Sequence, residues 1–283
     1  MQTSGNPVNG PNSIQHKKNK KRILIVASIA VVAIWFYAAR GTGWTNAINP
    51  AYWMRRMRGE DLYRAEGALL LHGNRDVPEV ALTFDDGPHA ESRAEILAIL
   101  KKESVKATFF DVGVNMTANP ELLIQTIEQG HEIGNHSQDH RSRLDTIEGM
   151  ERHHEINDAD ISYASVTGKH LKLLRPPGMR YNDSVLSDTK SLGYVVVGYT
   201  TASRDFSADE KPEDIADRTL ARTENGSIIL LHDYQATAKA LPAILKVLKE
   251  RGFRCVTISE MVSHLPTRPR SSAQKLLLNS NPN

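Results

Sequence analysis

The chain has 283 residues, which suits one large domain with a buried core plus terminal tails. Its 40% hydrophobic and 24% charged residues exclude a wholly disordered chain, and its formal net charge of +2 makes a nucleic-acid partner unexpected. Cys255 is the sole cysteine, which excludes an intramolecular disulfide and a metal site built from several thiolates.

The N-terminal region predicts a membrane anchor. Residues 1–22 form a polar tail that ends in the basic run KKNKKR, and residues 23–39 are an uncharged apolar run of 17 residues. A helix of that length spans roughly 25 Å, a little short of a typical hydrocarbon core, and flanking residues can extend it. Because basic residues are concentrated before this run, the tail is expected to be cytoplasmic and the rest of the chain extracytoplasmic.

A cleaved secretory signal is the alternative, because it too has basic residues before an apolar segment. The sequence favours a retained anchor. Trp35, Phe36 and Tyr37 cluster at the far end of the run like an interfacial aromatic belt, and they place bulky side chains where a cleavage site needs small ones. We therefore expect a single-pass transmembrane helix at 23–39.

Beyond the anchor, the sequence predicts a linker, one domain and a tail. Residues 40–66 combine Gly, Asn and Pro with a basic and aromatic stretch, and form a juxtamembrane linker that either rests on the headgroups or ends in a packing helix. Residues 67–266 alternate apolar runs with helical segments. Residues 267–283 lack a core pattern and are expected to be a flexible tail.

The domain at 67–266 predicts an α/β fold. The segments expected as strands are ALLLH, VALTF, KATFFDV, YVVVGYT, SIILLHD and FRCVTIS. The segments expected as helices are 91–103, 120–130, 143–161, 183–192, 212–225 and 236–251. Such alternation predicts parallel βα units in an open sheet or a barrel, with the chemistry at the carboxyl ends of the strands.

Two adjacent carboxylates, Asp85 and Asp86, follow the strand VALTF in the motif TFDDGP. Neighbouring aspartates repel each other unless a cation or a proton is present, so the pair indicates a metal site, a general base or one of each. The sequence DDGP also makes a good surface turn. The apolar strand before it favours the functional interpretation.

Two histidines, His136 and His140, lie four residues apart in GHEIGNHSQDH. This spacing predicts that they share one face of a helical turn, from which two imidazoles chelate one divalent ion. A carboxylate from elsewhere would complete a site of two histidines and one aspartate with a position open for water. Two solvent-facing histidines are the alternative.

Three further polar residues follow in the second half of the domain. Arg175 precedes two prolines and a glycine in LLRPPG, and because prolines fix the backbone it is held in a way that suits pairing with a carboxylate; an exposed arginine on a rigid loop is the alternative. Asp205 lies in SRDF. His232 closes the apolar strand SIILLH, where it suits a general acid whose pKa a carboxylate would raise.

In this order, TFDDGP, HSQDH, RPP, the Asp-Phe pair and LLH resemble the motifs of the polysaccharide deacetylase family, also called carbohydrate esterase family four. They run from Thr83 to His232, more than half of the chain. The resemblance implies a distorted (β/α) barrel with fewer than eight strands, a monomeric catalytic domain and an N-acetylated polysaccharide or oligosaccharide as substrate.

The resemblance also implies roles for the motif residues. Asp86, His136 and His140 are the implied ligands of a divalent cation, usually Zn2+, with Co2+, Mn2+ or Ni2+ as alternatives. Asp85 is the implied catalytic base, and Arg175 the arginine that pairs with it.

The remaining motifs supply an implied acid and an implied oxyanion site. His232 would protonate the departing sugar amine, and Asp205 would pair with His232. The turn at Pro177 and Gly178 would stabilise the oxyanion through the Gly178 N–H group.

Three positions depart from the pattern of many relatives. Gly178 stands where Tyr is frequent, Phe206 where Trp is usual, and Ala202 where Asp is often found. Glycine keeps the backbone donor but removes a side chain from the sugar pocket, so these departures affect substrate preference more than the reaction.

The implied activity is removal of N-acetyl groups from N-acetylglucosamine-type residues of a cell-envelope or extracellular polysaccharide. One alternative is a hydrolase of another C–N bond, in an imide or ureide, which the presence of both metal histidines disfavours. The other is a catalytically inactive, membrane-tethered glycan-binding module, which the presence of Asp85 and His232 disfavours.

Overall fold

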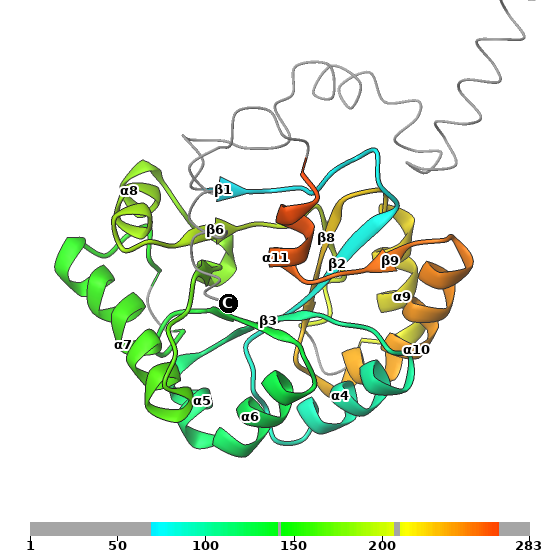
Figure 1. Cartoon of the computed structure of the whole chain (residues 1–283), viewed down its shortest axis with the longest axis horizontal. Coiled ribbons are helices and arrows are strands. Elements are labelled where there is room, and N and C mark those ends of the chain that lie inside the picture. Colours follow the sequence, from blue (N-terminus) through cyan, green and yellow to red (C-terminus); the bar gives the residue numbers. More distant parts are fainter. Residues whose placement is uncertain (1–68, 141–142, 207–209, 266–283) are drawn as a thin grey trace, which may run out of the picture.

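The computed structural model describes residues 69–140, 143–206 and 210–265 (Figure 1). Within them nine strands pair in parallel, in the order β1-β6-β5-β4-β3-β2-β8-β7, with β9 paired to the start of β2. The strands are β1 Leu69–Leu70, β2 Glu79–Asp85, β3 Thr108–Asp111, β4 Glu132–Asn135, β5 Leu173–Leu174, β6 Val195–Val197, β7 Thr201–Ala202, β8 Ser227–His232 and β9 Arg254–Cys255.

Helices follow most of the strands and surround the curled sheet (Figure 1). They are α4 Arg93–Lys102, α5 Gly113–Ala118, α6 Pro120–Glu128, α7 Gly149–Thr167, the 3-10 turn η1 Pro177–Met179, α8 Asp183–Ser191, α9 Pro212–Ala221, α10 Gln235–Glu250 and α11 Ile258–Ser263. The predicted α/β class and the parallel sheet are confirmed. The strand count differs from the expected number below eight, although four of the nine strands have only two residues.

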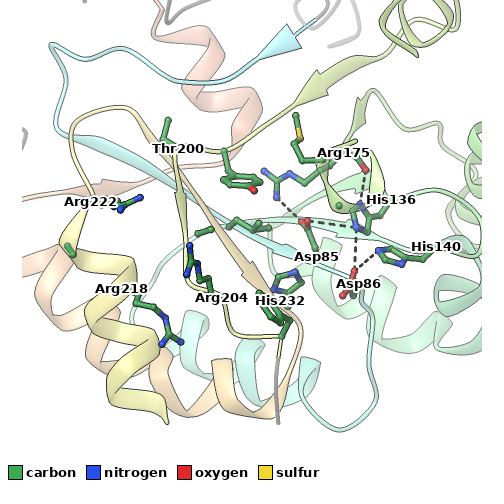
Figure 2. A pocket seen from close by; sticks show the side chains of 17 residues that line it. Asp85, Asp86, His136, His140, Arg175, Thr200, Arg204, Arg218, Arg222 and His232 are labelled. Carbon is green, nitrogen blue, oxygen red and sulfur yellow. Dashed lines mark hydrogen bonds and ion pairs between the residues drawn. The ribbon is translucent and has the colours of Figure 1, made fainter. Parts of the chain in front are cut away.

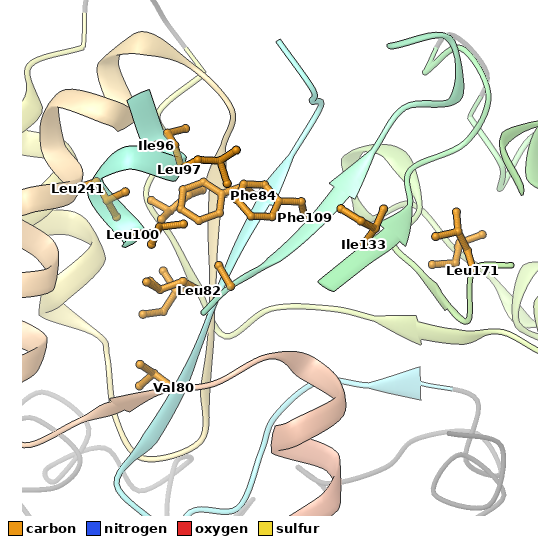
Figure 3. Packing of buried hydrophobic residues seen from close by; sticks show 14 of the residues in the cluster. Val80, Leu82, Phe84, Ile96, Leu97, Leu100, Phe109, Ile133, Leu171 and Leu241 are labelled. Carbon is orange, nitrogen blue, oxygen red and sulfur yellow. The ribbon is translucent and has the colours of Figure 1, made fainter. Parts of the chain in front are cut away.

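The alternation of side chains along the strands creates two apolar clusters. On β2, Val80, Leu82 and Phe84 point outward and pack under the helices, where Phe84 stacks on Phe109 with ring centroids 4.9 Å apart (Figure 3). Removing a fully buried ring such as that of Phe109 costs about 3–5 kcal/mol.

The inner face of the sheet carries the second cluster. Ala81 of β2 and Phe110 of β3 belong to it, and α11 adds Ile258, Met261 and Val262. Thr83 and Asp85 follow Ala81 on the same face of β2, beyond this apolar cluster. These polar residues lie toward the carboxyl end of the strand, where the candidate site is found.

Several predicted elements differ from the structure. The histidine motif is not helical: β4 ends at Asn135, and a loop follows it. The helix expected at 143–161 begins at Gly149 and continues to Thr167. The strand expected for FRCVTIS shortens to two residues, because the Thr257 hydroxyl accepts the Glu260 N–H and starts α11.

No helix in the described ranges is long and apolar enough to cross a membrane. The predicted anchor at 23–39, the linker at 40–66 and the tail at 267–283 lie outside the described residues.

Candidate active site

Most of the motif residues line one pocket of about 860 Å³ at the carboxyl ends of the strands (Figure 2). Asp205 does not line it but is hydrogen-bonded to His232, which does. Asp85 ends β2 and His232 ends β8, and the two residues are paired in register on these neighbouring strands. The fold therefore brings together side chains that are far apart in the sequence, at the edge where parallel α/β folds carry their active sites.

The two adjacent aspartates have different surroundings. Asp85 is buried, and its Oδ1 accepts a hydrogen bond from Arg175 Nη1 at 2.7 Å. Asp86 begins the turn after the strand with φ 74°, a left-handed conformation that is uncommon for a residue with a side chain. Its Oδ1 faces His136 and His140 instead. The backbone turn thus separates a residue suited to proton transfer from one suited to a metal.

Both histidines come from the loop after β4. Ser137 and His140 have positive φ values of 66° and 58°, and the His140 N–H donates to the Ser137 hydroxyl at 3.2 Å. This bend, rather than a helical turn, places the two rings 5.0 Å apart. His136 donates its Nδ1–H to the carbonyl of Arg175 at 2.7 Å, so its Nε2 lone pair is free to bind a metal.

Asp86, His136 and His140 fit one divalent cation, with ligand atoms that all lie within 4.8 Å of one another. Asp86 Oδ1 is 3.4 Å from His136 Nε2 and 3.3 Å from His140 Nε2. Ligands about 2.0–2.1 Å from a tetrahedral Zn2+ are about 3.3–3.4 Å apart, so these two distances match such a centre.

The charge state of Asp86 suits a metal ligand. Burial disfavours its ionised form, but hydrogen bonds and charge from His136, with a 2.6 Å hydrogen bond from the Tyr234 hydroxyl, outweigh burial and hold the pKa of Asp86 well below its usual range. The group is therefore an ionised carboxylate at neutral pH. A cluster of two imidazoles and one carboxylate with room for water is typical of catalytic zinc sites.

Arg175 is fully buried and holds Asp85 in place. Besides Asp85 its guanidinium donates to the Thr83 hydroxyl and to the carbonyls of Val197 and Gly198, and it stacks 4.2 Å from the centroid of Phe110. The prediction that the RPPG segment holds this arginine against a carboxylate is confirmed, and the exposed alternative is wrong.

His232 and Asp205 form a second pair across the pocket. The His232 Nδ1–H donates to Asp205 Oδ1 at 2.6 Å, while the Ser203 hydroxyl donates to the same carboxylate. Burial disfavours a charged His232, but the hydrogen bond and charge of Asp205 outweigh burial and raise the pKa of His232 above its ordinary value. The pair therefore favours the protonated imidazole, the form that a general acid requires.

The turn after Arg175 contributes Gly178, which has φ 60° and lines the pocket. Pro177 is buried in the same turn and does not line the pocket. Phe206 also lines the pocket; 68% of its surface is exposed, and it lies edge-on to His232 with centroids 6.4 Å apart.

Sequence reasoning missed a buried ionic cluster directly beneath the site. Arg93 donates to Asp111 at 2.5 Å and to Asp233 at 2.8 Å, with no exposed side-chain surface on any of the three. It also missed Tyr234. Asp233 and Tyr234 directly follow His232 at the carboxyl end of a strand, and this position was the only signal that pointed to them.

A parallel α/β sheet with ionisable groups gathered at its carboxyl edge defines the class of (β/α) enzymes. A family model for polysaccharide deacetylase matches residues 72–197. A peptidoglycan-N-acetylglucosamine deacetylase of Bacillus cereus is 34% identical over 191 residues, which cover 65% of this chain and 88% of the relative. The chain belongs to the polysaccharide deacetylase family.

Two further comparisons agree with that membership. A peptidoglycan-N-acetylmuramic acid deacetylase of Bacillus subtilis is 35% identical over 185 residues, which cover 64% of this chain but only 38% of that longer relative. A crystal structure of a peptidoglycan N-acetylglucosamine deacetylase in complex with a benzamide compound superposes with a TM-score of 0.66 and 29% identity, covering 75% of this chain and 96% of that one.

Proposed function

We propose that this protein is a metal-dependent deacetylase that removes N-acetyl groups from N-acetylglucosamine-type residues of a cell-wall polysaccharide. The observation that carries the proposal is that one pocket holds both a set of metal-ligating side chains and two side chains suited to acid-base chemistry. The cluster of Asp86, His136 and His140 has the spacing of a divalent cation site, and Asp85 and His232 are paired in register beside it.

The geometry supports a division of roles in amide hydrolysis. Asp85, oriented by Arg175, takes a proton from the water that adds to the acetyl carbonyl carbon. The Gly178 N–H supports the negative charge that develops on the carbonyl oxygen. When the C–N bond breaks, His232 gives its proton to the sugar nitrogen, and the products are acetate and a free amine.

Asp86, His136 and His140 would hold the cation. A divalent ion bound there, Zn2+ or another such as Co2+, Mn2+ or Ni2+, supplies Lewis acidity toward water and the acetyl carbonyl. The hydrogen bond from His136 to the Arg175 carbonyl and the one from Tyr234 to Asp86 orient two of the three ligands.

Acetate release tests the proposal directly. The full chain is incubated with N-acetylglucosamine oligomers and with peptidoglycan, with Zn2+ and with chelator, and acetate is measured. We expect release that chelator abolishes and Zn2+ restores. His136→Ala should lose bound metal and activity together, whereas Asp85→Asn should lose turnover but keep its metal, because Asp85 is assigned as the base.

Other outcomes would favour the other functions. Activity on cyclic imides or ureides without acetate release would identify a hydrolase of a different C–N bond. Binding of the glycan with no turnover on any substrate would indicate a glycan-binding module.

We further propose that residues 23–39 tether the protein to the membrane and that the catalytic domain acts on its outer side. The basic and apolar pattern of residues 17–39 supports this placement. Protease added to intact cells should cleave the domain, and retention of the full-length chain in the membrane fraction would separate an anchor from a cleaved signal.

A further inference from the structure

The pocket has a second wall that the proposed reaction does not use. Arg204, Arg218 and Arg222 line it, and we call these three residues the arginine wall. Figure 2 shows them on one side of the pocket, with the aspartates and the His136–His140 pair on the other and His232 between. A group bound at the wall therefore shares the pocket with the reacting acetamide.

Two elements build the wall. Arg218 lies in the last turn of α9 and Arg222 directly follows that helix, four residues later, on the same face. Arg204 follows β7 with φ 57°, a left-handed backbone that is uncommon for a long side chain. Arg218 Nε donates to the Ser203 carbonyl at 2.7 Å, which ties the helix to the segment that carries Arg204.

Among the described residues, ion pairs balance only part of the positive charge of this wall. Arg218 pairs with Glu210 at 2.6 Å. Within residues 69–140, 143–206 and 210–265, neither the Arg204 nor the Arg222 guanidinium has a hydrogen bond or an ion pair. Among these described residues, the carboxylates that line the pocket are Asp85 and Asp86, and each is already engaged across the pocket.

Arg218 and Arg222 lie four residues apart at the end of α9 and both line the pocket, so they present like charges to the same part of it. The neighbouring lining residues Ala202 and Ala221 are small, so space remains beside the guanidinium groups. Unpaired guanidinium groups around open space are suited to bidentate binding of a carboxylate or a phosphate.

We propose that the arginine wall binds an anionic substituent of the glycan and makes the enzyme prefer N-acetylated sugars that carry a carboxylate next to the N-acetyl group. The inference rests on the proposed deacetylase function. Of the two sugars named for the relatives, N-acetylmuramic acid carries a lactyl carboxylate beside its acetamido group, and N-acetylglucosamine carries none. A phosphate ester on the sugar presents the same anionic chemistry to the guanidinium groups.

The test compares matched glycans with the full-length, zinc-loaded enzyme. Short glycans of alternating N-acetylglucosamine and N-acetylmuramic acid are prepared with free lactyl carboxylates, with those carboxylates converted to neutral amides, and as amides that bear a 6-phosphate. We expect kcat/KM for acetate release from the free acid to exceed that from the amide by about tenfold, and the ratio to fall as salt screens the charges.

Variants assign the preference to the wall. Arg204→Gln and Arg222→Gln should each lower the acid-to-amide ratio about fivefold, whereas Arg222→Lys should retain part of it. The control Lys102→Gln removes an exposed positive charge at the end of α4, outside the pocket, and should leave the ratio unchanged. Thermal melts check that each variant is folded, and the salt dependence of the wild-type ratio gives an answer even where a variant does not fold.

The outcomes separate this inference from the proposed function. Equal kcat/KM for acid, amide and phosphorylated glycans would overturn the arginine wall and leave the deacetylase intact. A preference for the phosphorylated glycan alone would support the wall but assign its ligand as a phosphate. Absence of acetate from every glycan would overturn the proposed function and this inference with it.

Discussion

Two buried arginines lie on opposite faces of β3 and differ in what they bind. Arg93 stacks 4.1 Å from the centroid of Phe109, and Arg175 stacks 4.2 Å from the centroid of Phe110. Consecutive residues of a strand point to opposite faces, so one arginine lies on the helix side of the sheet and the other on the pocket side. Neither has more than 1% of its surface exposed.

The difference lies in how completely each charge is neutralised. Arg93 binds two carboxylates, Asp111 of β3 and Asp233 after β8, and so connects β3 and β8, which flank β2. Arg175 binds one, Asp85, whose other oxygen is 3.8 Å from His136 Nε2. Arg93, which is paired with two buried carboxylates, therefore stabilises the fold. Arg175 leaves one oxygen of Asp85 facing the pocket, so it positions a carboxylate that can take part in the reaction.

The largest expected effect is on the scaffold side. Arg93→Met should lower the free energy of unfolding by about 3–5 kcal/mol, because it leaves two buried carboxylates without a partner. Urea denaturation followed by circular dichroism measures the change. Arg143→Met is the matched control, since Arg143 pairs with Asp145 at a half-exposed position and should change stability by less than about 1 kcal/mol. Similar losses in the two variants would contradict the assignment of Arg93 as a scaffold residue.

On the pocket side, substitution should affect catalysis before it affects metal binding. Arg175→Gln removes the charged donor to Asp85, and kcat/KM for acetate release should fall about a hundredfold. His136 is held by the Arg175 main-chain carbonyl, which the substitution leaves in place, so the metal content should persist. Metal analysis of the folded variant checks this, and loss of metal together with activity would show that the side chain supports the ligands as well.

The contrast between the two arginines also shows what sequence patterns can predict. Arg175 stands out because two prolines and a glycine follow it, and its role could be inferred from local chemistry. Arg93 occupies an amphipathic helix, where an arginine ordinarily faces water. Its partners lie 18 and 140 residues away in the sequence, so only the folded topology brings them together.

The motif histidines also show which features the sequence could and could not predict. Their participation in one site was predictable from residue type and spacing, but the helical turn was the wrong backbone. Positive φ values at Ser137 and His140 bend the loop instead, and no residue preference in HSQDH signals such a bend. The fold class and the strand ends were predictable because apolar runs and helical periodicity are local, whereas two-residue strands such as β5 depend on their neighbours in the sheet.

The next effect concerns the acid across the pocket. Asp205 raises the pKa of His232 against the opposing effect of burial, and the proposed reaction needs His232 protonated. Activity should therefore fall as pH rises through that raised pKa. Asp205→Asn should shift the alkaline limb of the kcat/KM profile to lower pH and reduce the maximum about tenfold or more. If kcat/KM of this variant falls at the same alkaline pH as that of the wild type, the titration of His232 does not determine the alkaline limb.

The smallest expected effect is at Tyr234, which lies between the Arg93 cluster and the candidate metal site. It follows Asp233, the partner of Arg93, and its hydroxyl donates to Asp86 Oδ2 at 2.6 Å. Tyr234→Phe should weaken Zn2+ affinity about tenfold, because an outer hydrogen bond that orients a ligand carboxylate is lost. Titration of the metal-free protein against a competing chelator measures this affinity. Tyr199→Phe is the control, because Tyr199 lines the pocket but its side chain has no hydrogen bond among the described residues.

Because Tyr234→Phe leaves Asp233 and Arg93 paired, the free energy of unfolding of this variant should stay near that of the wild type. A loss of stability comparable to that of Arg93→Met would show that the scaffold and the metal site are one cooperative unit.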